Sequence, residues 1–167
     1  MKSVSLGAAA DSYVRQSQPG LNYGSATWMS VDRQDRSLLR FDLSGIPPGA
    51  TVLSATLTLC LPVAPGGAGV GRVHTLRRVT SAWTESGVTW NTQPSVAGGP
   101  YASLIVPALG CVSVNAGLDV QDWVNGLANY GWRINDANEA NAAPVKYSTR
   151  EDPAAGSRPR LDVTFVP

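Results

Sequence analysis

The residue types that transfer protons or hold catalytic metals are scarce in this sequence. It has one histidine, His74, inside the alternating run Val-His-Thr-Leu-Arg-Arg. A lone imidazole on a strand is far more typical of packing than of general-base catalysis. The three glutamates, Glu85, Glu139 and Glu151, lie far apart in the sequence, although two of them could meet in space as an acid pair. We recognise no nucleophile beside a base and no histidine-based metal site, and therefore expect a protein that is not an enzyme.

Residues 134–141, Ile-Asn-Asp-Ala-Asn-Glu-Ala-Asn, are rich in the side-chain oxygens that Ca²⁺ prefers. Their spacing matches no EF-hand, and a polar hairpin loop accounts for the same composition. Asp32 and Asp35 form a weaker candidate of the same kind. Calcium is the one cofactor that the sequence leaves open, and we expect no other. The candidate ligands are Asn135, Asp136, Asn138, Glu139 and Asn141.

Aromatic side chains are the usual platforms for sugars, because a flat ring matches the C–H face of a pyranose. Trp28 stands apart from the other tryptophans, since Met29 and Val31 take the core positions of its strand. The alternative is a Trp that covers a sheet edge or a subunit interface, where this residue type is also enriched. If a glycan site exists, we expect it to consist of Trp28, Tyr23, Asn22 and Arg33.

Charge gives little reason to expect a nucleic-acid or membrane partner. Charged residues make up 15% of the chain and the formal net charge is +1, so no general field would attract a polyanion. Arginine nevertheless far outnumbers lysine, and its planar fork suits carboxylates. We expect at least one buried pair of Arg40 or Arg160 with Asp42, Glu85 or Glu151. Recognition of an acidic sugar is the other interpretation.

Cys60 and Cys111 are the only cysteines, too few for a disulfide framework or a thiolate metal site. The sequence begins MKSVSLGAAADSYVR, which lacks the apolar stretch of an export signal. We therefore favour buried free thiols, and a disulfide between the two stays open. No window approaches the ~18 apolar residues needed to cross a bilayer, so we expect no membrane insertion.

Strand patterns dominate the elements that would position these residues. Residues 51–62, TVLSATLTLCLP, alternate at period two, which indicates a strand with one buried face. Residues 37–43 predict a second strand, and the Ile-Pro-Pro-Gly turn at 46–49 predicts a hairpin between the two. This abundance of short strands favours a sandwich or barrel. The other predicted strands are 11–15, 27–31, 71–79, 101–106, 111–114, 131–134, 144–149 and 160–166.

Helical periodicity is confined to residues 118–128, where Val120, Trp123, Val124 and Leu127 share one stripe. Acidic residues in its first turn suit the helix dipole. We expect a short helix that caps one open end of the sandwich. No repeat or linker divides the sequence, so we expect a single domain over residues 1–167. The strand pattern near the end should tie the C-terminus into a sheet.

Five stretches in order carry a family resemblance. They are LLRFDLSGIP (38–47), ATLTL (55–59), WTESGVTWNTQP (83–94), VQDWVNGLANYGW (120–132), and STRE (148–151) with RPRL (158–161). Together they resemble the DNRLRE family, which includes carbohydrate-binding modules of the alginate-binding type, over about residues 11–165. The resemblance implies an all-β jelly-roll sandwich of two antiparallel sheets, without catalytic machinery and usually appended to large surface or secreted proteins.

The resemblance also implies structural roles for the charged and aromatic residues of these motifs. The carboxylates are expected to bind arginines or loop amides, and the tryptophans to pack in the core. The residues in question are Arg40, Asp42, Trp83, Glu85, Trp90, Trp123, Glu151 and Arg160.

The missing export signal shapes the functional expectation. Self-contained domains of this kind resemble structural or receptor-binding proteins of phage particles, which assemble inside the cell. We therefore expect a decoration or attachment protein on a virion surface that docks to a protein partner. The alternative is an extracellular carbohydrate-binding module whose partner is a polysaccharide. A homo-oligomer is compatible with both.

Overall fold

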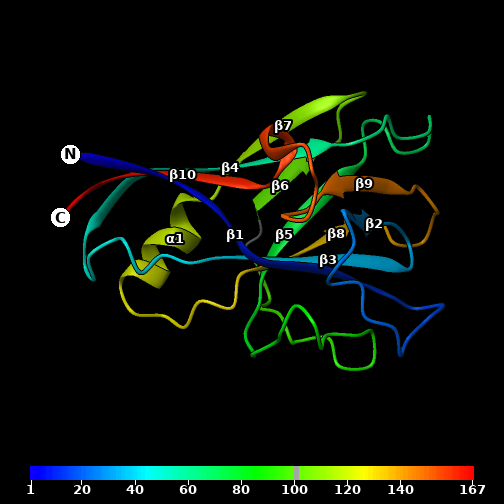
Figure 1. Cartoon of the computed structure of the whole chain (residues 1–167), viewed down its shortest axis with the longest axis horizontal. Coiled ribbons are helices and arrows are strands. Elements are labelled where there is room, and N and C mark those ends of the chain that lie inside the picture. Colours follow the sequence, from blue (N-terminus) through cyan, green and yellow to red (C-terminus); the bar gives the residue numbers. More distant parts are fainter. Residues whose placement is uncertain (100–101) are drawn as a thin grey trace.

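The computed structural model describes residues 1–99 and 102–167, and strands make up most of it (Figure 1). Residue Tyr101, with which one predicted strand begins, lies outside the described residues. The strands are β1 (Lys2–Arg15), β2 (Trp28–Val31), β3 (Asp35–Phe41), β4 (Thr51–Leu61), β5 (Val73–Arg78), β6 (Ala102–Ile105), β7 (Gly110–Asn115), β8 (Trp132–Asp136), β9 (Val145–Ser148) and β10 (Arg160–Val166), with the helices α1 (Gly117–Val124) and η1 (Ala155–Ser157).

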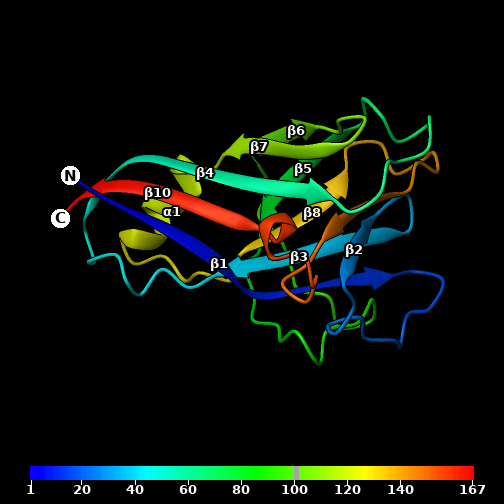
Figure 2. The same ribbon diagram turned by 45° about the horizontal axis from the view of Figure 1, so that its top comes forward.

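The strands form two facing antiparallel layers that share β1. Eight strands pair in the order β6-β5-β8-β3-β1-β10-β4-β7. Residues 2–7 of β1 pair with β10, whereas its second half pairs with β3 after a bulge between Ala8 and Ala10. The outermost strands, β6 and β7, lie next to each other (Figures 1 and 2). The small sheet of β2 and β9 lies at the end away from the two termini (Figure 1). The expected jelly-roll sandwich is confirmed.

The core lies between the layers and follows the predicted alternation. Leu57 and Leu59 of β4 are fully buried, and so are Leu39 of β3 and Trp132 of β8 from the other layer. Burying a large apolar side chain stabilises the fold by roughly 1.5–3 kcal/mol, so these facing strands supply much of the driving force for folding.

Two strand predictions are wrong in detail. The hairpin between residues 37–43 and 51–62 does not form, because β3 pairs with β1 and β8 while β4 pairs with β10 and β7. The turn at 46–49 instead carries the chain from one layer to the other, so that the apolar faces of both strands meet across the core. In addition, β1 begins at Lys2 rather than at residue 11, and its half-buried Val4 and Leu6 pack against the core.

Helix α1 is shorter than predicted but buries the expected stripe. Val120, Trp123 and Val124 are buried, whereas Leu127 lies beyond the helix and is 47% exposed. The chain leaves the helix at Gly126, whose φ of 106° is a conformation that other residues rarely adopt. None of the helices formed by the described residues has the length and apolar character to cross a membrane.

The expectation of free thiols is wrong, because Cys60 and Cys111 form a disulfide. The two residues face each other directly in the β4–β7 ladder. A separation of 51 residues along the chain gave no local signal of this pairing.

An irregular segment, residues 79–99, covers the outer face of the layer that contains β1 and β3. A second apolar cluster holds it there, in which Val14 and Leu38 contact Val88. Trp83 and Trp90, expected in the core, are half-buried against this cluster. The segment brings Glu85 to the edge of β1.

Candidate functional site

Three aromatic rings from β1, β2 and the turn between them form a stack. The ring of Tyr13 lies 4.2 Å from that of Tyr23 at 17° and 5.4 Å from that of Trp28 at 22°, measured between centroids. Tyr13 is buried on the inner face of β1, and burial raises its pKa to about 12. Tyr23 and Trp28 are half-buried, so they form the part of the stack that meets solvent.

A lysine from the neighbouring strand completes this surface. Lys146 Nζ lies 4.1 Å from the centroid of the Trp28 ring, a cation–π distance. Among the described residues, no carboxylate lies within ion-pair distance of Lys146. We call Tyr23, Trp28 and Lys146 the aromatic surface. Arg15 lies nearby, 5.6 Å from the Tyr23 ring, but two hydrogen bonds hold it to Asp35.

The other two residues of the expected glycan site are placed differently. Asn22 is next to Tyr23, but its Nδ2 donates to the carbonyls of Glu85 and Val88, both at 2.8 Å, and its Oδ1 accepts from Gly24. Asn22 therefore fixes the turn. Arg33 is exposed in the turn after β2, at the far end of this strand from Trp28. Sequence reasoning missed Lys146, because only the β2–β9 pairing brings it to Trp28.

Arginine side chains bind the carboxylates of the predicted calcium loop. Arg72 donates two hydrogen bonds of 2.8 Å to Asp136, and Arg36 donates two to Glu139. Asn138 contributes its backbone N–H to Asp136 and its carbonyl to Arg72. The adjacent Asn135 is buried in β8. Calcium binding by this loop stays a prediction, and it would require the arginines to move.

His74 is fully buried, and its Nδ1 lies 2.8 Å from the Tyr147 hydroxyl. Its Nε2 lies 3.8 Å from Asp136, which Arg72 already binds. Burial lowers the pKa of His74 to about 4, and burial likewise raises the pKa of Tyr147. The neutral imidazole is therefore a packed hydrogen-bonding group, as its position on a strand predicts.

Glu85 binds the kinds of partner expected for the motif carboxylates, an arginine and a backbone amide, but the arginine is neither Arg40 nor Arg160. Glu85 accepts a hydrogen bond from the backbone N–H of Asp11 and pairs with Arg150 at 3.0 Å. Arg160 pairs with Asp162 on the surface. The predicted pairs with Arg40 or Arg160 do not form, since neither arginine lies within ion-pair distance of Asp42, Glu85 or Glu151 in the described part of the chain.

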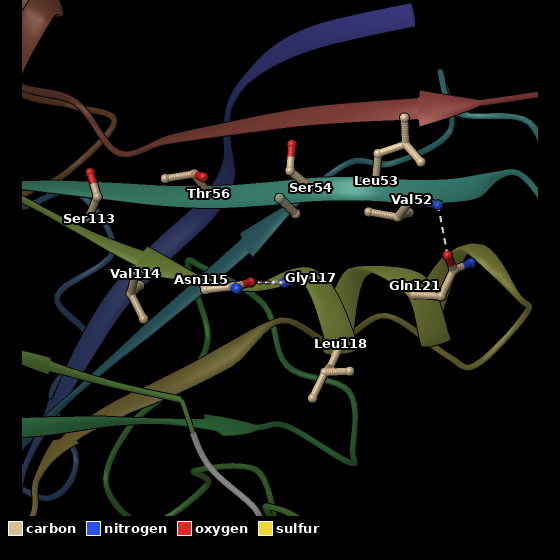
Figure 3. A pocket seen from close by; sticks show the side chains of 11 residues that line it. Val52, Leu53, Ser54, Thr56, Ser113, Val114, Asn115, Gly117, Leu118 and Gln121 are labelled. Atoms are coloured by element: carbon tan, nitrogen blue, oxygen red, sulfur yellow. Dashed lines mark hydrogen bonds between the residues drawn. The ribbon is translucent and has the colours of Figure 1, made fainter. Parts of the chain in front are cut away.

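An open groove runs along β4 beside the end of β7 and the start of α1 (Figure 3). Its volume is about 460 Å³. Gln121 binds the backbone N–H of Val52, and Asn115 binds that of Gly117, so both polar side chains are already engaged (Figure 3). Leu118, 81% exposed, projects at the side. The groove offers hydroxyls but no aromatic ring and no charge. Its polar lining is Ser54, Thr56, Ser113, Asn115 and Gln121.

A second hollow, of about 660 Å³, lies between α1 and the turn after β3. Arg40, Asp42 and Trp123 all line it. Trp123 is buried, and its indole N–H has no acceptor among the described residues. Asp42 accepts a hydrogen bond from the backbone N–H of Ser44, and that bond lowers its pKa. This hollow offers donors for a sugar but no exposed ring face.

These surfaces lie on a β-sandwich of the kind that serves as a binding module. The chain belongs to carbohydrate-binding module family 96, whose model matches residues 2–165. A search of curated proteins finds no match. A carbohydrate-binding module is a non-catalytic unit, which agrees with the expectation of a protein without enzyme activity.

The family distinguishes between the two functional hypotheses, a virion protein and a carbohydrate-binding module. It supports the carbohydrate-binding module, which was the alternative hypothesis, over the virion protein. The DNRLRE name and a phage origin receive no support from it. A role on a virion and a protein docking partner stay predictions, as does the oligomeric state.

Proposed function

We propose that this protein binds an acidic polysaccharide on the aromatic surface. The observation that carries the proposal is the Lys146 ammonium 4.1 Å above the Trp28 ring, without a carboxylate partner among the described residues. Membership of a carbohydrate-binding family supports the sugar, and the lysine favours an acidic one.

The two kinds of side chain have separate tasks in this proposal. The half-exposed rings of Tyr23 and Trp28 pack against the C–H faces of the sugar units. Lys146 swings from the Trp28 ring to the carboxylate or sulfate of a neighbouring unit. Because a charged contact at a surface is screened by salt, affinity for the acidic polymer falls as ionic strength rises.

Affinity electrophoresis and calorimetry with a polyuronate and with a neutral glucan test the proposal. Trp28→Ala should lower affinity for the polyuronate at least tenfold, which corresponds to about 1.4 kcal/mol. Lys146→Gln should weaken the polyuronate complex and reduce its salt dependence, because it removes the cation and keeps a polar chain. Leu118→Ala, in the groove of Figure 3, is the matched control and should bind like the native chain.

Unchanged affinity in both Trp28→Ala and Lys146→Gln would place the sugar elsewhere. A loss on Leu118→Ala would then favour the hydroxyl-lined groove and a neutral glycan. Melting temperatures for each variant separate lost binding from lost folding, since Trp28 also packs on Tyr13.

For location, we propose the extracellular alternative. Disulfides persist mainly in oxidising compartments, and the Cys60–Cys111 bond supports such a compartment. The prediction of a virion protein is tested separately, by the presence or absence of this chain in purified particles.

A further inference from the structure

Three carboxylates meet where β1 passes from one layer to the other. Asp11 lies on β1, Glu85 in the segment that covers the outer face, and Glu151 in the loop after β9. One oxygen from each lies within 4.8 Å of the others. Ionised carboxylates repel one another at such a distance, so the arrangement needs a bound cation or a shared proton.

Two oxygens of this group lack a donor although they are buried. The Asp11 side chain is completely enclosed, and only its Oδ2 accepts a hydrogen bond, from the backbone N–H of Arg150 at 2.7 Å. Among the described residues, neither Asp11 Oδ1 nor Glu151 Oε2 has a hydrogen-bond partner. A buried charged oxygen without a partner destabilises a fold by roughly several kcal/mol, so each such atom calls for a water, an ion or a proton.

The local charge also calls for a cation. Arg150 binds Glu85 and lies 3.9 Å from Glu151, which leaves three carboxylates, one guanidinium and a formal charge of −2.

We propose that Asp11, Glu85 and Glu151 bind one hard divalent cation, with Ca²⁺ as the best fit. Oxygens on opposite sides of Ca²⁺ lie about 4.6–5.2 Å apart, against about 4.1 Å for Mg²⁺. Carboxylates that lie within 4.8 Å of one another can therefore ligate the same Ca²⁺ with little movement. The ion brings the formal charge of the group to zero.

The ion would link three segments that are distant in the sequence, namely β1, the segment 79–99 and the loop after β9. Glu85 already accepts the Asp11 N–H on the free edge of β1. Its carbonyl binds Asn22 and lies against Gly24, where an added Cβ would come within 2.0 Å of that oxygen. Fixing Glu85 thus also fixes the turn that carries Tyr23. The proposed role is structural, and it does not depend on the sugar.

Calorimetric titration of the chelator-treated chain with CaCl₂, without any polysaccharide, tests the site. One ion should bind per chain. At Ca²⁺ concentrations 100-fold above Kd, the melting temperature should rise by ~5–10 °C over that in excess chelator. MgCl₂ should raise it less.

Variants assign the effect to the three carboxylates. Asp11→Asn and Glu151→Gln should each weaken Ca²⁺ binding at least tenfold and remove most of the melting shift. Asp162→Asn changes the charge equally but lies on β10 beside Arg160, so it should keep the full shift. Glu151 is partly exposed, so its variant keeps the test available if Asp11→Asn does not fold.

Two results would overturn the proposal. One is the absence of both heat and melting shift at millimolar Ca²⁺ or Mg²⁺, which would mean that the buried oxygens share a proton. The other is a calcium shift that persists in both carboxamide variants, which would place the ion elsewhere. Neither result bears on polysaccharide binding, so the two proposals fail separately.

Discussion

Single residues on the aromatic surface show what a local pattern can predict. Alternation along residues 27–31 correctly removed Trp28 from the core positions, because Met29 and Val31 are fully buried. Lys146 could not be predicted, since its place over the Trp28 ring follows from strand pairing between distant segments. The role proposed for Asp11 could not be predicted for the same reason, because only the fold brings Glu85 and Glu151 close to it.

His74 should make stability depend on pH in mild acid. Its pKa falls from 6.5 to about 4 in the folded chain, so the unfolded chain binds the proton more tightly. The stability that depends on a neutral imidazole is complete above pH 6.5 and is lost as the pH falls toward 4. The full loss is about 3 kcal/mol. Urea unfolding of the native chain and of His74→Phe between pH 7 and 4 measures it.

The variant should lack this component of the pH dependence. The groups around the ring are Tyr147, Asp136 and Arg72, and all three are retained in the variant. The chain has one histidine, so its imidazole NMR signals can be followed without ambiguity. A midpoint near 6.5 in the folded protein would contradict the prediction.

Among the elements, period-two alternation predicts where the strands lie. It does not predict which strands pair with one another. Residues 51–62 and 37–43 are both strands, as predicted. The Pro-Pro-Gly turn between them indicates only that the chain bends. Whether the bend makes a hairpin or a crossing between layers depends on which edges β1 and β10 already occupy.

The disulfide between β4 and β7 should contribute substantially to stability. It closes a loop of about 50 residues, and loop-closure entropy assigns about 4 kcal/mol to such a link. The Cys60→Ala/Cys111→Ala double variant should lose about this much in free energy of unfolding, as measured in urea.

A reductant should lower the free energy of unfolding of the native chain by nearly the same amount. It should leave the stability of the double variant unchanged. Equal stability of the native and double-variant chains would show that the link has no energetic role.

At the scale of the whole molecule, the β-sandwich and the membership of a carbohydrate-binding module family agree with what the sequence predicts. The resemblance over residues 11–165 predicted the jelly roll, and the matching family model extends over residues 2–165. For function, the family supports the carbohydrate-binding module, the alternative hypothesis, over a particle protein. The paired cysteines and the lysine on the aromatic surface could be recognised only after the strands were in place.

The start of β1 should be indispensable. Residues 2–7 pair with β10 and place Val4 and Leu6 against the core. Their removal leaves β10 as an open edge and uncovers apolar surface, so the shortened chain should aggregate or melt well below the native temperature. Size-exclusion chromatography and thermal unfolding report both effects. Removal of Met1 alone is the control, and a monomer of native melting temperature after the longer deletion would refute the prediction.

The pairing of Lys2 with Phe165 places the two ends of the chain side by side in one antiparallel ladder. A mechanical load applied between these ends would pull at right angles to the strands and open the ladder one pair at a time, as a zipper opens. The Cys60–Cys111 link lies between β4 and β7, outside this first step, and cannot resist it. The molecule would therefore yield to tension at low force, at the seam between its first and last strands.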